Sequence, residues 1–159
     1  VVGDGLRAWP PLTAGTAGDV FSENFASINR NKRSITADFK NKNDVEHLKN
    51  LVTVCDVVIE NYRPGVLPRL GLGYEDFKKI KPKLVYCSVS GFGQIGENAT
   101  KGAFDVTVQA FSGLMSVTGE TDGNPIKCGV PVGAFCAGLY AAFAILASLM
   151  QARQTGLGA

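Results

Sequence analysis

The sequence predicts an α/β protein in which a parallel sheet lies between layers of helices. Two β-branched runs, Asp56–Glu60 and Leu84–Ser90, have the composition of strands in a parallel sheet. Segments with helical spacing stand before, between and after them. This alternation of strand and helix is typical of a three-layer α/β fold.

The first part of the chain is expected to be mostly irregular. Residues 1–26 are rich in Gly, Pro, Thr and Ala, which predicts a loop, and Trp9-Pro10-Pro11 predicts a local turn within it. The alternating segment Ser34–Asp38 follows and is predicted to be a short strand.

Helices are expected from residue 43 onward. Valine and leucine recur at helical spacing over Asn43–Val54, where either Asn41 or Asn43 could cap the helix. After the Asp56–Glu60 strand, Tyr74–Ile80 is predicted to be a short helix that ends before Pro82. The Leu84–Ser90 strand comes next.

Two more helices complete the pattern. They are expected over Asp105–Ser116 and over the mostly apolar Gly133–Arg153, with Gly156 just past the end of the second. Between them and the second strand, GFGQIG (Gly91–Gly96) resembles a dinucleotide-binding fingerprint. No clear helix start follows it, so turn glycines are the favoured interpretation, and a nicotinamide-dependent oxidoreductase is a weak alternative.

Composition argues for a soluble globular protein, and a cytoplasmic location is the default expectation because no signal peptide opens the chain. Hydrophobic residues make up 45% and charged residues 19% of the chain, and the net charge of +2 gives no ground for a nucleic-acid or membrane partner. The continuous apolar run Leu139–Met150 is shorter than the roughly 20 residues of a membrane span. Basic residues crowd one stretch and form either a solvated face or a phosphate-binding edge: Arg30, Lys32, Arg33, Lys40, Lys42 and Lys49.

The cysteines are expected to be buried free thiols, because each lies in an apolar run and none forms a CxxC pair: Cys55, Cys87, Cys128 and Cys136. With one isolated His47, no metal site is predicted. Val1 opens the chain without a methionine, and the sequence after Thr155 reads as the turn before another strand. We therefore expect a chain truncated at both ends.

Several long strings, in the same order, resemble the class III CoA-transferases (CaiB/BaiF type), a family that includes formyl-CoA, carnitine and succinyl-CoA-dependent transferases and methylacyl-CoA racemase. The strings are NRNKRSITADFK (Asn29–Lys40), DVVIENYRPGVLPRLGLGYEDF (Asp56–Phe77), PKLVYCSVSGFGQIG (Pro82–Gly96), FDVTVQAFSGLMSVTG (Phe104–Gly119) and GVPVGAFCAGLYAAFAILASLMQARQTGLG (Gly129–Gly158). The resemblance implies part of a large, Rossmann-like, CoA-binding domain over 1–159, with the family's small domain absent.

The resemblance implies that coenzyme A or an acyl-CoA is bound as substrate, with a carboxylic acid as the other reactant. The phosphates of CoA need cations and backbone N–H groups as partners. In α/β proteins, ligands of this kind usually bind at the turns that follow the strands of the sheet. The implied groove residues are Ala37, Asp38, Phe39, Lys40, Asn61, Tyr62, Arg63, Arg69 and Lys101. Taken singly, Arg63-Pro64-Gly65 could be an ordinary strand-exit turn and Tyr62 an ordinary core aromatic.

The catalytic position of the family carries a different residue here. Class III transferases have a nucleophilic aspartate at the start of the long helix, and the resemblance places Ala134 at that position. A methyl group cannot form the mixed anhydride, and Cys136 would point about 200° away around the helix. Asp105 is expected to be structural. An engineered Asp→Ala change and a naturally inactive chain both remain open, and either predicts negligible turnover.

Two further functions are weighed against the transferase. Racemases of the family use a histidine before the acid that matches Asp105, and this chain has Phe104 there. Their second acid would fall at Ala134, so the racemase pattern fails at two positions. A non-catalytic CoA-binding or interaction module also fits. Because a cut sheet would expose apolar faces, the chain is predicted to form a homo-oligomer.

Overall fold

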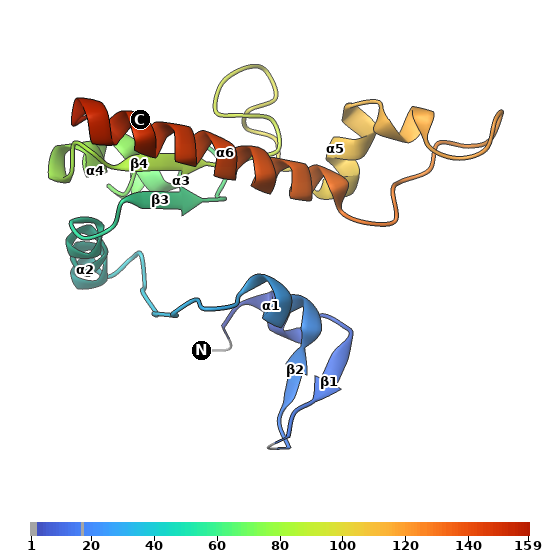
Figure 1. Cartoon of the computed structure of the whole chain (residues 1–159), viewed down its shortest axis with the longest axis horizontal. Helices are drawn as coiled ribbons and strands as arrows, with labels where there is room; N and C mark the ends of the chain where they lie inside the picture. Colours follow the sequence, from blue (N-terminus) through green and yellow to red (C-terminus); the bar gives the residue numbers. More distant parts are fainter. Residues whose placement is uncertain (1–2, 17) are drawn as a thin grey trace. The chain divides into compact units, whose positions relative to one another are not determined.

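A computed structural model describes residues 3–16 and 18–159, and the chain divides into two compact units, Val1–Thr36 and Ala37–Ala159. Figure 1 shows the elements of each unit. The first unit holds η1 (Gly5–Ala8), β1 (Leu12–Ala14), β2 (Val20–Ser22) and α1 (Glu23–Ile28). The prediction that residues 1–26 form a loop is therefore wrong.

Side chains that cap and cover the short elements explain the regular structure of the first unit. Strands β1 and β2 pair antiparallel, with Leu12 opposite Ser22. The Asp4 carboxylate accepts a hydrogen bond from the Leu6 amide at 2.8 Å, and the buried Ser22 hydroxyl accepts one from the Phe25 amide at 3.2 Å. The Arg7 guanidinium lies 4.0 Å from the centre of the Phe25 ring.

The second unit confirms the predicted α/β class. Its elements are α2 (Lys42–Val52), β3 (Val57–Glu60), α3 (Val66–Arg69), α4 (Tyr74–Ile80), β4 (Val85–Ser88), α5 (Asp105–Phe111), η2 (Leu114–Val117) and α6 (Val132–Thr155). Asn41 caps α2, and Gly156 ends α6 in the left-handed conformation. The predicted strand Ser34–Asp38 is wrong, because that segment has no regular structure.

A parallel strand pair forms the centre of the second unit. Val57 pairs with Val85 and Glu60 with Ser88, so the carboxyl ends of β3 and β4 lie at the same edge. On the other side of β4, the Tyr86 amide donates to the Ala159 carbonyl at 2.7 Å. Gly158 runs so close to β4 that an added Cβ would lie 1.9 Å from the Leu84 carbonyl oxygen, which explains why glycine is required there.

The hydrophobic core of the second unit lies between the strand pair and the helices α2, α3 and α4. Its buried members are Val52, Leu67, Leu72, Phe77 and Leu84. Val45 and Leu48, from the predicted apolar face of α2, pack against this cluster. The strands themselves are less buried than the sequence predicts, because Ile59 of β3 is 61% exposed.

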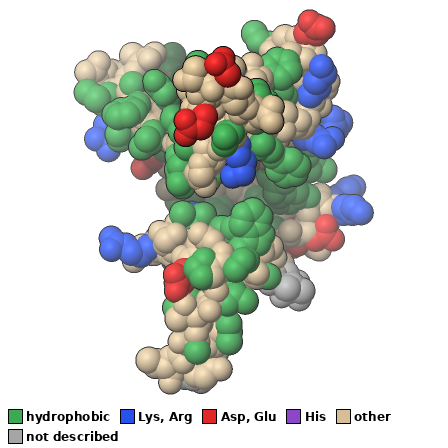
Figure 2. Space-filling model, turned by 90° about the vertical axis from the view of Figure 1, so that its right-hand side faces the viewer, with side chains coloured by type: hydrophobic (Ala, Val, Ile, Leu, Met, Phe, Trp, Pro, Cys, Tyr) green, Lys and Arg blue, Asp and Glu red, His purple; other side chains and the backbone are tan. Residues whose placement is uncertain are grey.

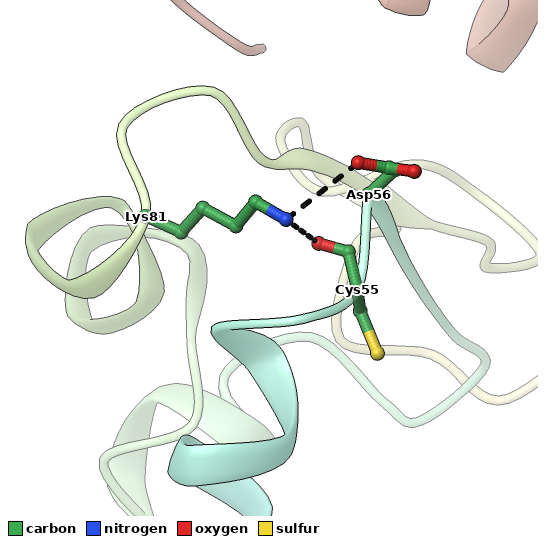
Figure 3. Close-up of polar contacts among 3 residues, drawn as sticks. All are labelled: Cys55, Asp56 and Lys81. Carbon is green, nitrogen blue, oxygen red and sulfur yellow. Dashed lines mark hydrogen bonds and ion pairs between the residues drawn. The ribbon is translucent and has the colours of Figure 1, made fainter.

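A lysine just after α4 ties this helix to the start of β3 (Figure 3). The Lys81 ammonium group donates a hydrogen bond to the Cys55 carbonyl at 2.5 Å and lies 3.6 Å from the Asp56 carboxylate. The Asp56 side chain is 80% exposed, and such exposed ion pairs contribute roughly 0–1 kcal/mol. The ion pair therefore adds little stability, and the hydrogen bond to the Cys55 carbonyl is the shorter of the two contacts.

Helix α6 packs along β4 and against α5 (Figure 1). Most of its residues are nevertheless exposed, and most of these exposed residues are apolar. Among its large side chains, Tyr140 is 76% and Phe143 71% exposed. In Figure 2, exposed hydrophobic side chains are interspersed with charged ones. A helix that is apolar on all sides is normally covered by protein or by lipid.

By length and composition, α6 is the one helix among the described residues that could cross a membrane. It has 24 residues, and its most apolar window has a mean hydropathy of 2.0. The expectation that this segment is too short for a span is therefore wrong, because the helix continues on both sides of Leu139–Met150. Core helices of soluble proteins have the same properties, so this feature alone assigns no membrane location.

Candidate functional site

The candidate site begins at the turn that follows β3. There the Tyr62 amide donates to the Glu60 carboxylate at 2.7 Å, and the Asn61 side-chain amide donates to the Val89 carbonyl at 2.6 Å. The Val89 amide in turn donates to the Glu60 carbonyl at 2.9 Å. These bonds fix the exit of β3 to the exit of β4, at the sheet edge where α/β proteins bind ligands.

A cavity of about 340 Å³ opens at this edge. Four of the residues implied by the family resemblance line it: Asn61, Tyr62, Arg63 and Lys101. The apolar Pro64, which follows β3, and the polar Ser90, which follows β4, also line the cavity. Residues 102–104 line another side of it. Residues that are up to 43 positions apart in the sequence, Asn61 and Phe104, thus line one cavity.

The cations of this cavity have no carboxylate partner among the described residues, where Lys81–Asp56 is the one ion pair. The Arg63 guanidinium crosses Gly102 so closely that an added Cβ there would lie 3.0 Å from its terminal nitrogen. Glycine at 102 therefore leaves room for the guanidinium. An unpaired arginine and lysine at one cavity suit a phosphate-bearing ligand.

Of the other implied residues, Phe39 lies next to the cavity and the rest lie outside its lining. The Phe39 and Tyr62 rings meet edge to face at 5.9 Å. Asp38 instead accepts a hydrogen bond from the Lys40 amide just before α2, while Ala37 and Lys40 contribute nothing to the cavity wall. Arg69 on α3 lies beside Gly65, whose added Cβ would be 3.2 Å from its guanidinium.

The start of α6 is connected to the same cavity through Phe104 and Asp105. Phe104 lines the cavity, and the next residue, Asp105, opens α5. Its carboxylate accepts a hydrogen bond from the Ala134 amide at 3.0 Å. Ala134 is exposed in the first turn of α6, a helix whose N-cap, Pro131, has no capping side chain. Asp105 therefore caps α6 from the neighbouring helix.

The sequence matches a family model described as CoA-transferase family III over residues 1–159. The chain belongs to this family. The succinyl-CoA:glutarate CoA-transferase of Mus musculus is 44% identical over 98% of this chain and 35% of its own length. The succinate–glutarate CoA-transferase of Agrobacterium fabrum is also 44% identical, over 98% of this chain and 40% of its own length.

A solved structure of a CAIB/BAIF family protein from Brucella suis has the same fold. It is 40% identical and superposes with a TM-score of 0.88, over 97% of this chain and 41% of that protein. The present chain thus spans about 35–41% of the length of these family III relatives. The resemblance inferred from the sequence is confirmed at the level of the family and of the fold.

Within this family III chain, the Asp105 carboxyl is held in its ionised form. The hydrogen bond from the Ala134 amide lowers the pKa of Asp105 most, and the Gln109 amide, the Gly133 amide and the Lys127 charge lower it further, against an opposing effect of desolvation. A lowered folded-state pKa stabilises the protein above the ordinary pKa of aspartate, near 3.9, and this contribution is lost as the pH falls.

We predict that Asp105→Asn removes part of the acid sensitivity of folding. The parent should lose stability between about pH 5 and pH 3, as the Asp105 carboxylate becomes protonated. Asp105→Asn should lose less stability over this range, because it has no carboxyl group at this position to protonate. Urea unfolding at both pH values measures the difference, with Asp122→Asn in the exposed 119–127 segment as the matched control. Equal acid losses in the parent and in Asp105→Asn would contradict this assignment.

The other side of the α6 start faces a more apolar cavity of about 600 Å³, lined by residues of α5, η2 and α6. Cys136 lines it and Ala134 does not, as the helical geometry predicts. Cys136 and Ala134 therefore lie on different sides of α6. All four cysteines are free, but Cys136 is exposed and the other three are partly buried, which corrects the prediction of buried thiols.

Proposed function

We propose that this chain is part of the large, Rossmann-like, CoA-binding domain of a CoA-transferase-like protein in a reducing compartment such as the cytoplasm. Active relatives of this type would move CoA between an acyl-CoA thioester and a carboxylic acid. The observation that carries the proposal is the cavity at the carboxyl edge of β3 and β4, where Arg63 and Lys101 have no carboxylate partner. Two 44% identical relatives suggest succinyl-CoA and glutarate as the substrate class.

The arrangement suits CoA in two ways. The diphosphate needs cations, which Arg63 and Lys101 supply, and the aromatic face of Tyr62 can pack on the adenine or the pantetheine arm. From this cavity, Phe104 and Asp105 lead to residue 134, so the thioester would reach toward the start of α6. In this proposal Phe39 supports Tyr62, and the 37–40 segment and Arg69 form the outer edge of the groove.

In a relative with aspartate at the position of residue 134, the reaction would take place at that side chain. Its carboxylate attacks the thioester carbonyl, which forms a mixed anhydride and releases the CoA thiolate. The thiolate then attacks the carbonyl of the residue-134 carboxyl, which releases the first acid and leaves an enzyme–CoA thioester. The acceptor carboxylate runs these two steps in reverse. Helix α6, through its N-terminal dipole, would stabilise the negative charge at this point.

With alanine at position 134 the chain lacks this nucleophile, so we propose that it binds CoA without transferring it. A non-catalytic CoA-binding module is accordingly the second candidate function, and Ala134 is the observation that favours it. The racemase alternative gains no support, because Phe104 and Ala134 occupy its two catalytic positions.

Calorimetric titration with CoA tests the binding proposal. Binding in the micromolar range is expected, and pantetheine, which has no phosphate, should bind much more weakly because Arg63 and Lys101 would have no anion to contact. Absence of CoA binding by the 159-residue chain and by the longest polypeptide that carries it would contradict the proposal.

We also propose that the protein forms a homo-oligomer, since the exposed apolar side chains of α6 would then be covered. Sedimentation velocity at micromolar concentration should show a species larger than the monomer. A strictly monomeric profile across the micromolar range would contradict the proposal.

A further inference from the structure

Gln109 of α5 is one of two buried polar side chains among the described residues, with 1% of its surface exposed. Its amide oxygen accepts a hydrogen bond from the Cys128 amide at 2.7 Å. Its amide nitrogen donates to the Asp105 carboxylate at 2.5 Å and contacts the Val130 carbonyl at 3.5 Å. One side chain therefore bridges α5 to two points of the segment that leads into α6.

A buried amide side chain is unfavourable at a position where only the packing space has to be filled. Burying it costs free energy unless each polar atom is paired, and an apolar side chain of similar volume would avoid that cost. All polar atoms of Gln109 find partners, so the network is fully satisfied. Satisfied buried networks of this kind fix one geometry for the segments they join.

Both ends of the network lead to residue 134. One arm runs from Gln109 to Asp105 and then to the Ala134 amide. The other arm holds Cys128 and Val130, immediately before Pro131 begins the approach to α6. Gly133 belongs to the same arrangement, because an added Cβ would lie 3.1 Å from the Asp105 carboxylate oxygen.

We propose that Gln109 is a positioning residue for the chemistry at residue 134: it orients the Asp105 carboxylate and anchors the 128–130 segment, so that the first turn of α6 presents residue 134 in one fixed place. The catalytic part of this inference rests on the proposed transferase function. The structural part, that Gln109 fixes the α6 start, stands on the hydrogen bonds alone.

The test uses Gln109→Glu in the Ala134→Asp background of the longest polypeptide that carries this sequence. The substitution replaces a donor by an acid beside the Asp105 carboxylate, and two such carboxyl groups share one proton readily but repel when both ionise. The other charged or titratable groups around this point are Lys127, Cys136 and the carboxyl introduced at 134.

As the pH rises from 5.5 to 8, we expect the kcat of Gln109→Glu to fall about tenfold or more relative to the kcat of its Ala134→Asp parent at the same pH. The KM for acyl-CoA should change less than about threefold. A merely structural role would lower activity equally at both pH values. The matched control is Gln151→Glu on the exposed side of α6, which should follow the pH profile of the parent. A pH-independent loss, or a change confined to KM, would overturn the catalytic part.

Hydrogen exchange in Gln109→Met separates this inference from the proposed function. Faster exchange of the amides of residues 132–135, with an unchanged far-UV circular dichroism spectrum, supports the anchoring role even if the Ala134→Asp parent proves inactive. That inactivity would count against the proposed chemistry at residue 134 instead. Unchanged protection of these amides in Gln109→Met would overturn the inference, including in the case where Gln109→Glu fails to fold.

Discussion

Replacing Ala134 with aspartate is expected to create CoA-transferase activity at least about 10³-fold above that of the parent, because loss of a nucleophile slows covalent mechanisms by this order or more. Position 134 is exposed in the first turn of the 24-residue helix α6, where the helix dipole stabilises a carboxylate. The measurement is CoA transfer from succinyl-CoA to glutarate in the longest polypeptide that carries this sequence.

The matched control for this gain is Ala134→Asn, which has the shape of aspartate without its nucleophilic carboxylate. It should stay as inactive as the parent. Mass spectrometry of Ala134→Asp after brief exposure to succinyl-CoA should also detect CoA bound to the protein as a thioester. Turnover by the unmodified Ala134 protein, or equal activity in the Asp and Asn variants, would contradict the assigned role of this position.

Arg63→Ala is expected to weaken CoA binding about 10- to 100-fold, which corresponds to losing one or two charge-assisted hydrogen bonds to phosphate. The guanidinium lies at the cavity beside Lys101 and has no carboxylate to compensate its charge among the described residues. Titration calorimetry measures the affinity. Arg63→Lys should be intermediate, since an ammonium group cannot make two parallel bonds to one phosphate.

Arg153→Ala, which removes an exposed cation from the last turn of α6, is the matched control and should change the affinity less than about twofold, since it lies in no described cavity. Binding of pantetheine should be the same in the parent and in Arg63→Ala, because this ligand carries no phosphate. Equal CoA affinities for Arg63→Ala and Arg153→Ala would place the phosphates away from the cavity.

The sequence predicts the second unit better than the first, for a physical reason. Helices α2, α4 and α6 have apolar periodicity or clear end signals, and their bounds are close to the predicted ones. Strands β1 and β2 have three residues each, too few for alternation to be recognised. Conversely, Ser34–Asp38 has the alternation of a strand but no partner strand, and Ile35 is 67% exposed.

The candidate site is predictable where family strings mark it and unpredictable where long-range contacts make it. Asn61, Tyr62, Arg63 and Lys101 are implied by the resemblance, and the structure brings them to one cavity. A structural role for Asp105 is expected from the sequence, but its contact with α6 is not. The cap joins residues that are 29 positions apart, which no local sequence pattern reveals. Gln109 carries no sequence signal, because one glutamine in an apolar run is also compatible with an exposed position.

A structure of this protein with CoA bound tests the central claim most directly. We predict that the diphosphate lies in the cavity between Asn61–Pro64 and Lys101–Phe104, with a phosphate oxygen within about 3.2 Å of the Arg63 or Lys101 nitrogen atoms, and that the thiol points toward Ala134. CoA bound on another surface, with this cavity empty and its thiol far from Ala134, would contradict the account.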